Sequence, residues 1–118
     1  MHDICLQKLP VVLAVDRAGL VGDDGETHQG VYDMAFLSTM PNMTIYSPAT
    51  QQELVHMLRL AISLGEPAAV RYPRGSLMQA VSEQPVEKGV WEEILPISNQ
   101  TVIATGTMVS VALPVCRK

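Results

Sequence analysis

The pattern of apolar and polar positions along the chain alternates between strand-like runs and helix-like periods. Residues 11–15 form an unbroken apolar run, which predicts a strand buried on both faces of a parallel sheet. Residues 43–46 and 67–72 predict two further strands, and Pro73 ends the last of them. Alternating strands and helices indicate an α/β fold, in which a parallel sheet with flanking helices is joined by right-handed crossovers.

The helix signals lie between these strands. Residues 33–39 predict a short helix, and residues 51–64 predict a longer one. Thr50 and Glu53 have the spacing of a capping box before the longer helix, and Gly65 is well placed to end it. The apolar positions of this helix share one face at helical spacing: Leu54, Met57, Leu58, Ala61 and Ile62.

The pattern changes in the last third of the chain. Residues 80–100 contain prolines, glutamates and a lone tryptophan without a clear period, which is typical of a linker between domains. We expect a short strand around residues 90–95 of this linker. Residues 101–106 predict a new strand, and the glycine and threonine that follow lead toward a helix.

Both ends of the chain suggest a piece of a longer protein. Residues 1–8 read as a helix with no cap before it, and the last helical stretch meets Pro114. We therefore expect part of one domain, a linker and the start of a second domain. The expected bounds are residues 1–79, 80–100 and 101–118.

The loop at residues 16–30 is the most distinctive polar segment. It contains four glycines, four acidic residues, one arginine and one histidine, and it follows the first strand. Residues 71–75 follow another strand and carry two arginines. Because ligands bind outside the carboxyl ends of parallel strands, this placement favours a binding loop over the alternative, an ordinary solvated turn.

The charged residues of these segments suggest anion binding beside acid–base chemistry. Arg17, Arg71 and Arg74 are candidate anion receptors, although Arg71 still belongs to the strand and could form a structural ion pair. Asp24 and His28 lie four residues apart and are candidate catalytic and substrate-binding groups. The alternative is that Asp24 caps a turn and His28 packs within the loop.

Composition narrows the function classes. The chain has 118 residues, of which 47% are hydrophobic and 17% charged, with a formal net charge of −4. This composition is typical of a globular domain and argues against nucleic acid as the partner. The apolar run at residues 9–15 is too short to span a bilayer, so we expect no membrane partner. One histidine among scattered acids lacks the spacing of a zinc site, and Cys5 and Cys116 read as reduced thiols.

The run at residues 16–33, Asp-Arg-Ala-Gly-Leu-Val-Gly-Asp-Asp-Gly-Glu-Thr-His-Gln-Gly-Val-Tyr-Asp, resembles the 1-deoxy-D-xylulose-5-phosphate synthases. So does Ala-Val-Arg-Tyr-Pro-Arg-Gly at residues 69–75, and the resemblance extends from His2 to Met108. Transketolases and the β subunits of 2-oxo acid dehydrogenases carry looser versions of these motifs. The resemblance implies a partial thiamine diphosphate pyrimidine-binding domain, followed by the start of a transketolase C-terminal domain.

The resemblance also implies an activity. The family joins pyruvate to D-glyceraldehyde 3-phosphate with loss of carbon dioxide, using thiamine diphosphate and magnesium. Its product feeds isoprenoid, thiamine and pyridoxal synthesis. The parent protein is then expected to be a homodimer in the cytoplasm, or in a plastid if it comes from a plant or alga.

Matched by motif, Arg17 and Arg74 correspond to residues that hold the phosphate of the acceptor. Asp24 and His28 correspond to groups that face the substrates near the reactive carbon of the cofactor. The catalytic glutamate and the domain that binds diphosphate and magnesium are expected upstream, so we expect no cofactor or metal ligands here and no activity from this chain alone. The alternatives are another transketolase-like enzyme, a dehydrogenase β subunit, or a non-catalytic truncated module that only associates with other chains.

Overall fold

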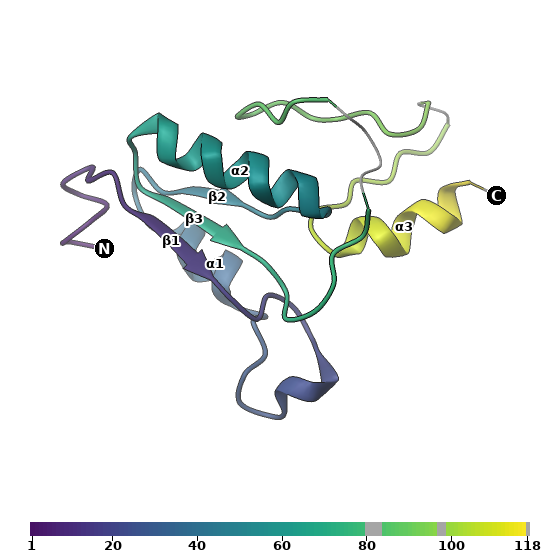
Figure 1. Ribbon diagram of the computed structural model, residues 1–118, viewed down its shortest axis with the longest axis horizontal. Coiled ribbons are helices and arrows are strands. Elements are labelled where there is room, and N and C mark those ends of the chain that lie inside the picture. Colours follow the sequence, from purple (N-terminus) through teal and green to yellow (C-terminus); the bar gives the residue numbers. More distant parts are fainter. Residues whose placement is uncertain (80–83, 97–98, 118) are drawn as a thin grey trace.

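The computed structural model describes residues 1–79, 84–96 and 99–117. Three strands form one parallel sheet in the order β1-β3-β2, with β1 at Val12–Val15, β2 at Thr44–Tyr46 and β3 at Ala68–Arg71. Val12 and Thr44 both pair with Ala68, so the three strands run in step and their carboxyl ends meet at one edge (Figure 1). The predicted α/β fold with a parallel sheet is confirmed.

Helices cover the sheet. The helix α1 spans Asp33–Ser38, α2 spans Gln51–Leu64 and α3 spans Met108–Cys116, and a 3-10 turn, η1, lies at Gly22–Asp24. In Figure 1, α2 runs along the sheet on the near side, and α1 lies on the far side. Right-handed crossovers require this arrangement, because β3 returns to the position between β1 and β2. None of the helices in the described ranges is long and apolar enough to cross a membrane.

The core lies between β3 and α2. Tyr46, Ala61, Ala68 and Val70 form the buried cluster, and the partly buried side chain of Val12 packs against it. β3 is the central strand, so its first three residues are buried, whereas the residues of β1 are only half-buried or exposed. The expectation that the first strand is buried on both faces is wrong, because β1 is an edge strand of this sheet.

The start and end of α2 follow its local sequence. The Thr50 hydroxyl accepts a hydrogen bond from the Glu53 amide at 3.0 Å, as the capping pattern predicts. The Glu53 carboxylate accepts from the Ala49 amide at 2.7 Å rather than from the amide of Thr50. Gly65 adopts a φ of 63°, the left-handed conformation that ends many helices.

The predicted apolar face of α2 is only partly confirmed. Leu58 and Ile62 are exposed, at 38% and 65%, whereas the side chains that pack toward the core are Leu54, Met57, Leu60 and Ala61. A sheet of three short strands covers a narrower stripe of the helix than its apolar residues occupy, so two of the five predicted positions face outward.

Two short predicted elements at opposite ends of the chain differ in the structure. Residues 1–8 form hydrogen-bonded turns instead of a helix, and the left-handed φ of 51° at Lys8 ends them. At the other end, α3 continues to Cys116 although Pro114 lies inside it. Pro114 falls in the last turn, where the missing N–H removes only a single bond of the helix, so the expected break does not occur.

Two predicted strands do not form. Residues 90–95 and 101–106 contain no strand in the described part of the chain. The described sheet consists of β1, β2 and β3, and neither segment joins it. An apolar run becomes a strand only where a neighbour accepts its backbone hydrogen bonds, and neither run has that neighbour here. Residues 80–83, 97–98 and 118 of the expected linker and second domain lie outside the described residues.

Candidate functional site at the carboxyl edge of the sheet

The loop after β1 is closed at its base by backbone hydrogen bonds. Gly19 and Gly30 exchange two of them, at 2.9 and 3.1 Å, and the Gly30 amide also donates to the Arg17 carbonyl at 2.9 Å. We call residues 17–19 and Gly30 the neck of the loop. A Cβ atom at position 30 would lie 2.3 Å from the Arg17 carbonyl oxygen, so only glycine fits there. Gly30 thus allows a close approach between two segments of the chain's own backbone.

Gln29 connects the two sides of the loop above the neck. Its side-chain oxygen accepts from the Val21 amide at 2.8 Å, and its side-chain nitrogen donates to the carbonyls of Val21 and Gly25 at 2.9 and 2.7 Å. Sequence reasoning gave Gln29 no role. The available signal was its chemistry, because an amide both donates and accepts, which a loop without regular pairing needs.

The η1 turn carries the central acidic group of the site. Asp24 Oδ1 accepts hydrogen bonds from Arg17 Nη1 at 2.5 Å and from Arg74 Nη1 at 3.0 Å. The Arg74 Nη1 atom also donates to the Asp23 carbonyl at 3.0 Å. We call Arg17, Asp24 and Arg74 the Arg–Asp–Arg cluster. Arginines that follow different strands thus meet at one edge, as the order of strands and loops predicts.

Burial within the Arg–Asp–Arg cluster is uneven. The Asp24 side chain is 0% exposed, whereas the side chains of Arg17 and Arg74 are 39% and 49% exposed. The Asp24 Oδ2 atom is buried and has no hydrogen-bond partner among the described residues. Parts of both arginine side chains therefore reach solvent, whereas the Asp24 side chain does not.

His28 lies apart from this cluster. It is exposed, and its Nδ1 atom shares a hydrogen bond of 2.8 Å with the Thr27 hydroxyl. The hydrogen bonds found for Asp24 go to Arg17 and Arg74, so the structure shows no Asp24–His28 pair among the described contacts. The substrate roles of these residues stay predictions.

Arg71 forms the structural ion pair that its position in the strand allowed. Its Nε and Nη2 atoms donate to the two carboxylate oxygens of Asp33 at 2.7 and 3.1 Å. It also donates to the Ser47 hydroxyl and to the Gly30 carbonyl, both at 3.2 Å. The side chains of Arg71 and Asp33 are only 14% and 7% exposed. Arg71 therefore joins β3, α1, the end of β2 and the neck of the loop.

The start of α3 is attached to the same edge. The Gly106 amide donates to the Ser47 carbonyl at 3.1 Å. Gly106 has a φ of 57°, and a Cβ atom there would lie 2.6 Å from the Ser47 hydroxyl. Ser47 thus links Arg71 to the segment that leads into α3.

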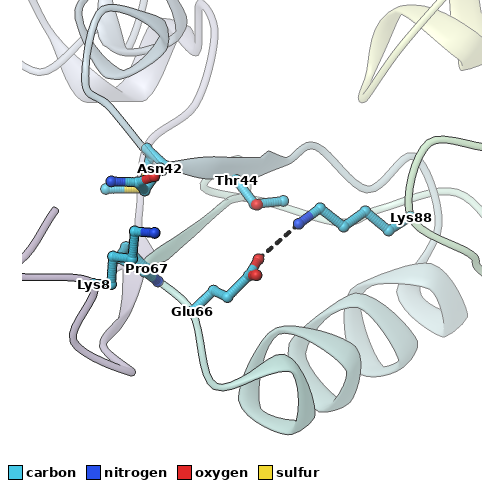
Figure 2. A pocket seen from close by; sticks show the side chains of 7 residues that line it. Lys8, Asn42, Thr44, Glu66, Pro67 and Lys88 are labelled. Carbon is cyan, nitrogen blue, oxygen red and sulfur yellow. Dashed lines mark hydrogen bonds and ion pairs between the residues drawn. The ribbon is translucent and has the colours of Figure 1, made fainter.

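The opposite, amino edge of the sheet carries a different feature. A pocket of about 290 Å³ opens there, lined by residues that include Lys8, Asn42, Thr44, Glu66, Pro67 and Lys88 (Figure 2). Lys88 Nζ and Glu66 Oε2 are 2.8 Å apart, and both side chains are about half exposed. The hydrogen bond from Lys88 lowers the pKa of Glu66, and the same bond raises the pKa of Lys88. Sequence reasoning predicted no site at this edge.

The described residues do not form a magnesium–diphosphate site. Over residues 1–79, 84–96 and 99–117, no group of three or more histidine, cysteine, aspartate or glutamate residues gathers to hold a metal ion. The two buried aspartates at the carboxyl edge, Asp24 and Asp33, are engaged by arginines. We therefore derive no chemical step through magnesium or diphosphate from these residues.

Comparison with known proteins shows the family of this chain. Residues 1–79 match the family model of the transketolase pyrimidine-binding domain. The 1-deoxy-D-xylulose-5-phosphate synthase of Clostridium kluyveri is 50% identical over 119 residues, covering 100% of this chain and 19% of the relative. That of Clostridium tetani is 52% identical over 116 residues, covering 98% of this chain and 19% of the relative. The chain thus spans about a fifth of the length of the curated relatives it matches.

A solved structure has the same fold. A split-gene transketolase, described as an inactive β4 tetramer, superposes with a TM-score of 0.85 at 27% identity, covering 97% of this chain and 37% of the other. The resemblance to the synthases that the motifs indicate is confirmed by the identities along the whole chain. The family implies thiamine diphosphate as the cofactor of its enzymes. The chain belongs to the family of the transketolase pyrimidine-binding domain.

Proposed function

We propose that this chain forms part of a 1-deoxy-D-xylulose-5-phosphate synthase, a thiamine diphosphate-dependent transferase. The reaction joins pyruvate to D-glyceraldehyde 3-phosphate with loss of carbon dioxide. The identity of 45–52% to synthases over nearly the whole chain supports this activity. The role of the described residues is to hold the phosphate of the acceptor substrate at the carboxyl edge.

The observation that carries this role is the meeting of Arg17 and Arg74 on one carboxylate oxygen. The cluster has two positive charges and one negative charge, which leaves an excess of one positive charge. Among the described residues only the Nη1 atom of each arginine is engaged, so other N–H groups of both guanidinium groups are free to bind. Paired guanidinium donors match the oxygens of a phosphate group, which supports a phosphate receptor here.

His28 is proposed as a substrate-facing group that accepts or donates a proton. It is exposed on the same loop as Arg17, and the hydrogen bond to Thr27 orients its ring. An imidazole carries both a donor and an acceptor nitrogen, which suits this role. Magnesium, a homodimeric parent protein and a location in the cytoplasm or a plastid are proposed from the resemblance alone.

The proposed domain division places the boundary of the pyrimidine-binding domain at residue 79, a linker at residues 80–100 and the start of a C-terminal domain at residues 101–118. The match of the family model to residues 1–79 supports the first boundary.

A binding experiment tests the phosphate receptor on the chain itself. Glycerol 3-phosphate, an unreactive analogue of the acceptor, is titrated into the purified chain in a calorimeter. Replacing Arg17 or Arg74 by alanine is expected to weaken binding by about 10-fold or more, because each removes charge-assisted hydrogen bonds. Arg59→Ala is the matched control, since Arg59 is exposed on α2. Equal affinities in all variants would contradict the proposal.

A chimaera tests the activity. The matching segment of the Clostridium kluyveri synthase is replaced by this chain, and formation of deoxyxylulose phosphate is measured with thiamine diphosphate and magnesium. We expect the chimaera to be active and Arg74→Ala to raise its KM for glyceraldehyde 3-phosphate more than its KM for pyruvate. The 118-residue chain alone is expected to be inactive, because it spans about a fifth of the length of the synthases it matches. Transketolase activity in place of synthase activity would favour the alternative enzyme.

A further inference from the structure

The phosphate receptor alone does not explain the buried carboxylate of Asp24, which is bonded to both of its arginines. We propose that Asp24 is a positioning residue, which aligns Arg17 and Arg74 on one phosphate group and does not itself touch the substrate. The inference rests on the proposed phosphate receptor and specifies how that receptor is built. It replaces the expectation that Asp24 faces the substrates.

Burial separates the roles of the three side chains. The Asp24 side chain is 0% exposed, whereas 39% of Arg17 and 49% of Arg74 reach solvent. Because the Asp24 side chain has no exposed surface, a ligand that approaches from solvent meets the arginine side chains first. On this reading the carboxylate acts on the ligand through the arginines.

The shared oxygen atom gives the alignment. Arg17 follows β1 and Arg74 follows β3, and both are long, flexible side chains of like charge. Without a counter-charge they would repel each other and sample many rotamers. With Nη1 of each within 3.0 Å of Asp24 Oδ1, both are ordered before a ligand arrives, which lowers the entropy cost of binding.

The carboxylate is in turn held by the closed loop. The Asp24 amide donates to the Val21 carbonyl at 2.9 Å, and the side chain of Gln29 connects Val21 to Gly25 on either side of Asp24. The neck at Gly30 ties this unit to the end of β1. The position of Asp24 is thus set by backbone geometry rather than by the arginines.

A competing account makes the opposite prediction. If Asp24 only occupies the place of the phosphate, or only adds negative charge beside it, then removing that charge strengthens phosphate binding. If Asp24 positions the arginines, then removing its charge weakens binding although the site becomes more positive. The sign of the change separates the two accounts.

The experiment measures the affinity of the full 118-residue chain for inorganic phosphate by calorimetry at constant ionic strength. We expect Asp24→Asn to weaken binding by about 10-fold, because the two guanidinium groups lose their common partner. Glu26→Gln is the matched control, since it removes one negative charge from an exposed position of the same loop, and we expect a change within about twofold. Equal or tighter binding by Asp24→Asn overturns the inference.

An Arg17→Ala background adds a readout that a purely structural role would not move. With one arginine absent there is no pair to align, so Asp24→Asn should weaken phosphate binding less there than in the wild-type chain. An equal loss in both backgrounds overturns the inference. If the wild-type chain binds no phosphate, or Arg17→Ala and Arg74→Ala bind as tightly as wild type, the proposed receptor itself fails. Phosphate binding that depends on both arginines but not on Asp24 refutes only the positioning role.

A measurement on the wild-type chain covers the case in which Asp24→Asn does not fold. Phosphate is titrated while the Arg side-chain Nε–Hε signals and the Asp24 carboxyl carbon signal are followed by NMR. We expect the signals of Arg17 and Arg74 to move and that of Asp24 to stay. Movement of the Asp24 signal to the position of a solvated carboxylate means that phosphate displaces it, and overturns the inference.

Discussion

The two edges of the sheet hold ion pairs of different kinds. At the carboxyl edge, Asp24 and Asp33 are buried and bound by arginines. At the amino edge, Glu66 and Lys88 form a pair in which both side chains are about half exposed (Figure 2). A buried carboxylate depends on its partner, whereas an exposed one exchanges its partner for water at little cost. The carboxyl edge is thus the one where single charges decide structure and binding.

The largest effect is expected for Arg71→Ala. The variant leaves the Asp33 carboxylate buried without its two-point partner, which typically costs about 3–5 kcal/mol in the free energy of unfolding. Chemical denaturation followed by circular dichroism measures this loss. Lys88→Ala removes the cation of the exposed pair and should lower the free energy of unfolding far less. Similar losses in both variants would remove the distinction between the two edges.

The next effect is expected at the neck of the loop. In Gly30→Ala the new methyl group meets the Arg17 carbonyl at 2.3 Å, so the backbone must shift, at a cost of about 1–3 kcal/mol. The shift should also weaken phosphate binding, because it moves Arg17. The matched control is Gly22→Ala, where a Cβ atom meets nothing within 4 Å. Thermal unfolding and phosphate titration of both variants measure the difference, and equal behaviour would show that the neck is not constrained.

A smaller effect of opposite sign is expected in the core, where Tyr46 lies. The Tyr46 hydroxyl is buried without a partner among the described residues, so Tyr46→Phe should raise the free energy of unfolding by about 1 kcal/mol. Burial raises the pKa of Tyr46 above its ordinary value of 10.0. The neutral form is therefore favoured in the folded chain, and stability is lost as the pH rises from 10.0 through the folded pKa.

Tyr46→Phe should reduce the loss of folding stability at alkaline pH. Tyr32→Phe is the control, because Tyr32 is 77% exposed. This substitution should leave the pH dependence of the unfolding free energy unchanged. Unfolding free energies measured from pH 8 upward give both curves. A less stable Tyr46→Phe would mean that its hydroxyl has a partner outside the described residues.

The smallest effect is expected for the exposed pair itself. Lys88 lowers the pKa of Glu66, so the contribution of Glu66 to stability is present above its unfolded pKa and is lost as the pH falls through the folded value. Glu66 raises the pKa of Lys88, so that contribution is lost as the pH rises through the folded pKa of Lys88. At low salt, the free energy of unfolding of Glu66→Gln should fall slightly less with decreasing pH than that of wild type. High salt should abolish this difference. Glu87→Gln serves as the control. A difference between Glu66→Gln and wild type that persists at high salt would mean that the Glu66–Lys88 pair is less accessible to solvent.

The sequence predicted the elements that depend on local signals and missed those that depend on neighbours. The cap at Thr50 and the end at Gly65 follow from adjacent residues, and both are confirmed. The exposure of Ile62 and the missing strand at residues 101–106 depend on which surfaces lie alongside, which a local pattern does not encode.

The candidate site also has features that the sequence predicts and features that it does not. The common edge for Arg17 and Arg74 follows from the order of strands and loops, so it could be predicted. The burial of Asp24 between them and the bonds of Gln29 across the loop depend on how the loop folds back. Asp24 and His28 lie four residues apart in the sequence, but the loop directs the two side chains to different partners.

The neck has a consequence for the motion of the loop. Because Gly19 and Gly30 are bonded to each other and Ala18 is bonded to Tyr72, residues 20–29 can open as one cooperative unit while the sheet stays folded. Each such opening releases the carboxylate of Asp24 from both arginines at once. The amide protons of Gly19 and Gly30 would therefore exchange with solvent more slowly than those within the loop, and the difference measures how long an assembled receptor survives between openings.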